Sequence, residues 1–183
     1  AVSHDLNGKS ESALEEYILA ADANPSFEPV VLEAARRLIR AQQTDKAIGL
    51  LSRAANDADV SGLVHAWLGM AYAQSGKPDL AVAANRAAIK KAPRSLAAYQ
   101  NLAQVYLQTS RTNEALGVLD QAAKQVPNDA NFLIEVAEMF SRFGRAQAFP
   151  AETVKPRVTT ALDQAARLDP SSLSVLLKLA ENS

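Results

Sequence analysis

The 183-residue sequence contains no cysteine, only seven glycines and eight prolines, and only 5% aromatic residues. Without cysteine the chain can form no disulfide, no thiolate metal site and no cysteine nucleophile. Because glycine and proline supply most tight turns, their scarcity argues against an all-β fold built from many short strands. The cysteine-free composition suits both the cytoplasm and the bacterial periplasm, and it does not choose between them.

Strong charge and long apolar runs are missing as well. The formal net charge is −1, and no tract is rich in lysine and arginine. Such a tract is the electrostatic footprint of a nucleic-acid binder. No stretch of about eighteen apolar residues, the length that predicts a membrane span, occurs in the sequence. We therefore expect no nucleic-acid partner and no direct membrane insertion.

Alanine is abundant, at about one residue in five. Alanine has the highest helix propensity and a very small apolar side chain, so alanine-rich faces let two helices approach closely. This composition predicts an all-α fold.

Helical patterns in the sequence are interrupted by polar breaks at intervals of 34 residues. The breaks contain Gly8, Gln42, Gly76, Ser110 and Gly144. Two columns of alanine follow the same step: Ala13, Ala47, Ala81 and Ala115, and Ala20, Ala54, Ala88 and Ala122. Because these columns are independent and agree, they indicate an internal repeat.

The copy at residues 62–95 carries the fullest pattern: His65-x2-Leu68-Gly69-x2-Tyr72, then Ala81, Ala88 and Pro93. The next copy repeats it with Tyr99, Leu102, Ala103, Tyr106, Ala115, Leu119, Ala122 and Pro127. These residues resemble the tetratricopeptide repeat (TPR) family, whose signature is W-x2-L-G-x2-Y followed by A-x3-F, alanine and proline. The chain departs from that signature at His65 and Tyr99, where the family favours tryptophan, and at Asn85, where it favours phenylalanine.

The resemblance implies an all-α, right-handed superhelix, or α-solenoid, of antiparallel helix pairs over residues 1–183. We predict a partial repeat at 1–27 with a helix over 10–23, four repeats at 28–61, 62–95, 96–129 and 130–172, and a terminal helix at 173–183. The expected helix pairs are 28–41/45–57, 62–75/79–91, 96–109/112–125 and 130–143/157–168.

The last of these repeats is interrupted by an insertion at residues 145–156, which we expect to lengthen the turn between its helices. This segment is either a plain surface loop or a loop that touches a ligand. Residues 173–180 are apolar around most of a helix, whereas a terminal repeat normally keeps a polar outer face. We therefore expect that the chain continues or that this end forms a homo-oligomer.

Catalytic chemistry is not evident in the sequence. The two histidines, His4 and His65, both fall on repeat positions, and no carboxylate or histidine converges on them at helical spacing. We predict no enzyme activity, no cofactor and no metal.

In TPR proteins the first helix of each repeat lines a concave groove, so the resemblance implies where a partner would bind. The candidate residues are Arg36, Arg40, Leu63, Trp67, Met70, Gln74, Gln100, Asn101, Gln104, Gln108, Glu135 and Glu138. Trp67 and Met70 would form an aromatic–thioether platform for an apolar side chain, unless Trp67 only packs between helices.

The remaining candidates are polar. The amides from Gln74 to Gln108 form a stripe that either binds a peptide backbone or is merely solvated. Arginines at one end of the groove and glutamates at the other would orient a dipolar ligand. We therefore predict a protein- or peptide-binding scaffold; the alternatives are a structural spacer that acts through its ends and a targeting arm of a larger multidomain protein.

Overall fold

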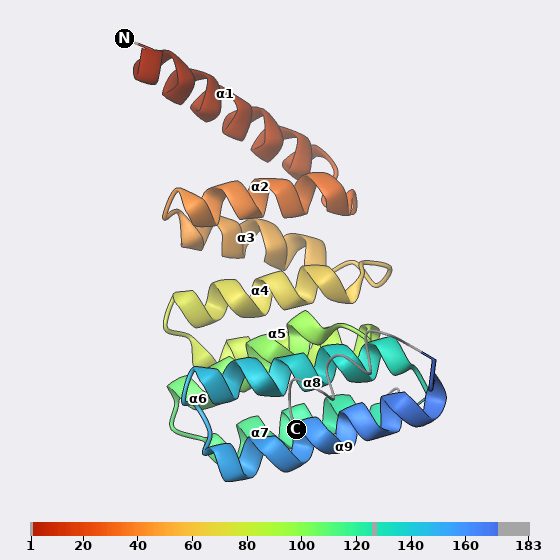
Figure 1. The fold of residues 1–183 in the computed structure, drawn as a ribbon. Helices are drawn as coiled ribbons and strands as arrows, with labels where there is room; N and C mark the ends of the chain where they lie inside the picture. The colour runs from red at the N-terminus through yellow and green to blue at the C-terminus, as the bar shows by residue number, and fades with distance from the viewer. Residues whose placement is uncertain (1, 126–127, 172–183) are drawn as a thin grey trace. The chain divides into compact units, whose positions relative to one another are not determined.

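The structure is a computed structural model that describes residues 2–125 and 128–171. These residues form nine α-helices and no strand, which confirms the all-α helical repeat class (Figure 1). The chain divides into two compact units, residues 1–92 and 93–183. None of the helices in the described ranges is both long and apolar enough to cross a bilayer.

Unit 1 contains five helices, which pack in chain order. They are α1 (Val2–Ala23), α2 (Glu28–Arg40), α3 (Thr44–Ala55), α4 (Gly62–Gln74) and α5 (Pro78–Lys91). Helices α2 and α3 form one pair and α4 and α5 form the next, while α4 also contacts α2 and α3 (Figure 1). The core between them consists mainly of alanine, leucine and valine, for example Ala34, Leu51 and Val64, all essentially inaccessible to solvent. The small alanine side chains permit this close packing.

Unit 2 contains two helix pairs within the described residues. Its helices are α6 (Leu96–Gln108), α7 (Thr112–Gln125), α8 (Ala130–Arg145) and α9 (Ala151–Leu168). Helix α6 pairs with α7 and α8 with α9, and α8 also contacts α6 and α7. Its core holds larger side chains than that of unit 1, including Tyr99, Tyr106, Phe140 and Met139.

The turn inside each helix pair has the same backbone geometry. Gln42, Gly76 and Ser110, spaced 34 residues apart, all have positive φ angles of 60–67°, and Gln147 has a φ of 55° in the last pair. In each turn the next residue donates its N–H to the carbonyl five residues earlier, as in Lys77 N–H to Tyr72 O at 2.9 Å. This is the hydrogen bond of a Schellman motif, which ends an α-helix at a left-handed residue.

Side-chain bonds also follow the repeat spacing. Asp57 accepts a hydrogen bond from Ser26, and Arg53 pairs with Asp22, in both cases 31 residues away. Glu28 accepts hydrogen bonds from the N–H and hydroxyl of Ser61, both at 2.6 Å. Because these partners lie about one repeat apart, the bonds link successive repeats within unit 1.

Two expectations about helix bounds are wrong. The sequence predicted a break at Gly8, but α1 is one continuous helix from Val2 to Ala23. A glycine inside a helix lowers its stability by only about 1 kcal/mol, which a long helix tolerates. The first repeat therefore has no turn at that position.

The second error concerns the insertion at 145–156. Helix α8 continues to Arg145, and α9 begins at Ala151 rather than 157, so the connecting loop covers only residues 146–150. Pro156 lies inside α9, where it removes one helix hydrogen bond. Val154 packs so closely against Gly144 of α8 that a Cβ on Gly144 would lie only 3.1 Å from Val154 Cγ1. This packing offsets the lost hydrogen bond. The insertion thus mainly extends a helix instead of lengthening the turn.

The remaining helix bounds agree with the sequence to within about two residues. The terminal helix expected at 173–183, and the self-association expected from it, lie outside the described residues. The repeat boundaries stay a prediction.

Candidate functional site

Six of the predicted site residues lie in unit 1, on α2 and α4. Leu63, Trp67, Met70 and Gln74 share one face of α4, because their spacing of three to four residues follows the helical turn. Leu63 is 43% exposed and Gln74 is exposed, whereas Trp67 and Met70 are half-buried. Trp67 packs against the hydrophobic core of unit 1, so part of its surface serves packing and only the rest is open to a partner.

The two arginines on α2 differ in their surroundings. Glu33 accepts hydrogen bonds from Arg36 Nε at 2.8 Å and from Arg37 Nε at 2.6 Å. The hydrogen bond from Arg36, followed by that from Arg37, holds the pKa of Glu33 below its ordinary value. Arg36 is therefore already engaged within its own helix. Arg40 is exposed and forms no ion pair within the described chain.

The other six predicted residues lie in unit 2, on α6 and α8. Gln104 and Gln108 are exposed on α6, and Asn101 is half-buried. Gln100 accepts a hydrogen bond from Arg142 Nη2 of α8 at 3.3 Å. Glu135 and Glu138 are exposed on α8. Each unit thus holds six of the predicted residues, and the charge split between Arg36 and Glu135 stays a prediction.

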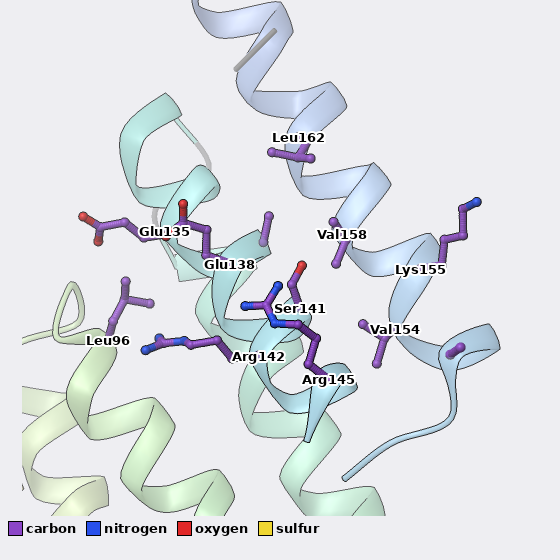
Figure 2. Close-up of a pocket in the computed structure, with 13 residues that line it drawn as sticks. Leu96, Glu135, Glu138, Ser141, Arg142, Arg145, Val154, Lys155, Val158 and Leu162 are labelled. Carbon is purple, nitrogen blue, oxygen red and sulfur yellow. The ribbon is translucent and has the colours of Figure 1, made fainter. Parts of the chain in front are cut away.

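Unit 2 contains a cleft of about 860 Å³ over α8 and α9 (Figure 2). Its lining residues are Leu96, Glu135, Ala137, Glu138, Ser141, Arg142, Gly144, Arg145, Ala151, Val154, Lys155, Val158 and Leu162. Val154, Val158 and Leu162, one helical turn apart on α9, are almost fully buried and form an apolar floor. Clefts of this size with an apolar floor and a few charged groups are typical binding sites.

The insertion at 145–156 contributes directly to this cleft. Four lining residues, Arg145, Ala151, Val154 and Lys155, come from it. Of the predicted site residues, only Glu135 and Glu138 line the cleft. The prediction missed Lys155 because it followed the first helix of each repeat, whereas Lys155 is carried by α9. The sequence signal that could have found it was the insertion itself.

Three buried polar atoms lie outside the cleft without a hydrogen-bond partner among the described residues: His65 Nε2, Asn85 Oδ1 and Tyr99 Oη. Burial, and secondly the nearby Lys91, lowers the pKa of His65, so the imidazole favours its neutral form. Burial raises the pKa of Tyr99. No group of three potential metal ligands occurs in the described ranges.

Comparison with known proteins identifies the repeat. One tetratricopeptide repeat model matches residues 32–95 and a second matches residues 72–133, which together cover more than half of the chain. The chain belongs to the tetratricopeptide repeat family. As a TPR protein it is a protein-interaction scaffold. A search of curated proteins finds no match.

Solved TPR structures have the same fold. MamA aligns with a TM-score of 0.59 and 16% identity, over 90% of this chain and 94% of MamA. YrrB, described as a TPR protein with an unusual peptide-binding site, aligns with a TM-score of 0.52 and 16% identity, over 96% and 86% of the two chains. A thermophilic TPR protein in Thermus thermophilus aligns with a TM-score of 0.53 and 16% identity, over 99% and 94%. At these identities the likeness shows the fold alone.

Proposed function

We propose that this TPR protein binds a short segment of a partner protein in the unit 2 cleft, without catalysing a reaction. The observation that supports this proposal is the combination of an apolar floor on α9 with charged side chains on α8 (Figure 2). Burial of apolar side chains supplies most of the affinity of a peptide, and charged groups at the rim supply selectivity. The description of YrrB as a peptide-binding TPR protein is consistent with this class of ligand.

Site-specific photo-cross-linking tests the proposal. A photoreactive amino acid replaces Ala151, which is exposed and lines the cleft, and in a matched control it replaces Gln121, which is exposed on α7 and does not line it. We expect a partner to be cross-linked from position 151 and not from position 121 in cells that produce the protein. Equal cross-linking from both positions, or none from position 151, would refute the cleft as the binding site.

A second candidate surface is the face of α4 that carries Leu63, Trp67, Met70 and Gln74. The observation that favours it is the large exposed fraction of Leu63 beside the half-buried Trp67. Trp67→Ala is expected to abolish binding at this face without unfolding the repeats. Because Trp67 also packs on the core, the exposed variant Leu63→Asp provides an independent test. Unchanged partner binding by both folded variants would remove this surface from consideration.

A further inference from the structure

The charged residues of the unit 2 cleft are segregated along α8. Glu135 and Glu138 lie near the middle of the helix, and Arg142 and Arg145 lie in its last turn. Because an α-helix rises about 1.5 Å per residue, Glu135 and Arg145 are separated by about 15 Å along the axis. One end of the cleft is therefore acidic and the other is basic.

Helix α9 strengthens this division because it runs antiparallel to α8. Val154 packs beside Gly144, next to the basic end, and the neighbouring Lys155 lines the cleft from α9 with its side chain extended away from α8 (Figure 2). One turn further along α9, Val158 lies level with Glu138, and Leu162 lies a turn beyond it (Figure 2). The apolar floor from Val154 to Leu162 thus connects the basic end to the acidic end.

The cations at the basic end are not committed to acidic partners. Arg145 and Lys155 are exposed and take part in no ion pair within residues 2–125 and 128–171. Arg142 contacts the neutral amide of Gln100 at 3.3 Å. By contrast, Arg157 on the same helix as Lys155 donates to both carboxylate oxygens of Asp120, at 2.7 and 3.0 Å. The cleft cations therefore remain available for an incoming carboxylate.

We infer that the occupant of this cleft is a dipolar peptide segment, with a basic residue at one end, an acidic residue at the other and aliphatic residues between them. This inference rests on the proposed function, because it specifies the ligand of the same cleft. The basic residue faces Glu135, and the acidic residue faces Arg145. An extended chain covers about 15 Å with about five residues, so a hexapeptide places one charge at each end.

A capped, fluorescently labelled hexapeptide, Lys-Leu-Ala-Val-Leu-Glu, is the probe. Matched control peptides carry glutamine at both ends, lysine at both ends or glutamate at both ends. Fluorescence anisotropy with the full chain measures each affinity. Two exposed ion pairs predict binding about fivefold tighter for the dipolar probe than for the glutamine control at low salt. The difference should shrink as salt screens the charges.

Reversal of the charge of two cations that line the cleft provides the decisive comparison. In the double variant Arg145→Glu/Lys155→Glu, we expect the dipolar probe to bind at least fivefold more weakly and the peptide with two lysines to bind more tightly. Both substituted residues are exposed, so circular dichroism should show an unchanged helix content. The matched control Lys124→Glu reverses an exposed charge on α7, outside the cleft, and should leave all four affinities unchanged.

Three outcomes would overturn the inference. Equal affinities for all four peptides would show that charge does not select the ligand, even if cross-linking from position 151 supports the proposed function. Binding of the probe only after removal of residues 172–183 would identify the chain's own C-terminal segment as the occupant. Dimers that dissociate in the double variant without peptide would identify a second copy. Failure of the cross-linking experiment, by contrast, would refute the proposed function itself.

Discussion

Gly69 on α4 lies directly against the buried side chain of Asn85 on α5, and this contact predicts the effect of adding one methyl group. A Cβ on Gly69 would lie 2.6 Å from Asn85 Cγ and 2.8 Å from Oδ1, with Nδ2 closer still. Real Cβ atoms do not make such contacts. Asn85 is fully buried, and its Nδ2 donates to Ala81 O at 2.9 Å. The side chain therefore has no open space to enter.

The expected loss of stability follows from three contributions. Replacement of glycine by alanine inside a helix normally raises the free energy of unfolding by about 1 kcal/mol. Overpacking of a core costs about 1–3 kcal/mol, and loss of a buried hydrogen bond costs about 1–3 kcal/mol more. We therefore expect Gly69→Ala to lower the free energy of unfolding by about 2 kcal/mol.

Urea denaturation followed by tryptophan fluorescence measures this change. Trp67 is the only tryptophan and lies on the same helix as Gly69, so its fluorescence reports on this helix pair. Gly49→Ala on α3 is the matched control, because a Cβ there meets no atom within 4 Å. This control should be about 1 kcal/mol more stable than the original chain.

A double-mutant cycle separates the steric cause from other effects. Asn85→Ala removes the side chain that collides with the new methyl group, so Gly69→Ala should become neutral or stabilising in that background. The expected coupling energy is about 2 kcal/mol, typical of residues in direct contact. Equal stabilisation by Gly69→Ala and Gly49→Ala would refute the reasoning, as would a coupling energy of zero.

Three further predictions concern the left-handed turn residues, His65 and the helix cap at Asp129. In urea denaturation, Gln42→Gly should raise the free energy of unfolding by about 0.5–1 kcal/mol, because glycine adopts the left-handed conformation of this position without strain. Gly76→Ala should lower the free energy of unfolding by about 1 kcal/mol for the converse reason. Equal effects of the two changes would contradict this explanation. Because burial lowers the pKa of His65, the unfolded state binds more protons below pH 6.5, so stability measured between pH 7 and 5 should fall with acidification. His65→Gln should reduce this dependence. The N–H of Phe132 donates a hydrogen bond to Asp129 Oδ1 at 3.0 Å, and this bond is the largest cause of the lowered pKa of Asp129. The stability that this carboxylate contributes is therefore present above its ordinary pKa of 3.8. It is lost as the pH falls through the lower pKa of the folded state. Thermal melts of Asp129→Ala should show a lower melting temperature at pH 7, and a loss of the same size in the original chain at pH 5 would refute this assignment.

Much of the fold could be predicted because it depends on local sequence. The 34-residue step located the turns at Gln42, Gly76 and Ser110 from the sequence alone, whereas Gly8 and Gly144, on the same step, lie inside helices and the last left-handed residue is Gln147. Each of these turns is formed by hydrogen bonds between residues five or fewer apart, so a short stretch of sequence encodes it. Helix bounds next to such turns were accurate for the same reason.

The candidate site was only partly predictable. Glu135 and Glu138 could be assigned from the repeat register, because a helix presents residues of fixed spacing on one face. The opposite end of the cleft could not be assigned in that way. Arg145 and Lys155 line the same cleft only because α9 begins before Pro156 and turns back along α8.

The sequence by itself determined the helical class, the repeat period and the positions of three turns, since periodic local preferences fix all three. Only the tertiary structure decided that the insertion becomes helix and lines a cleft. Proline at 156 argues locally against that helix, whereas the packing of Val154 against Gly144 favours it. Contacts between residues distant along the chain outweigh a single unfavourable residue, and their geometry cannot be read from repeat spacing.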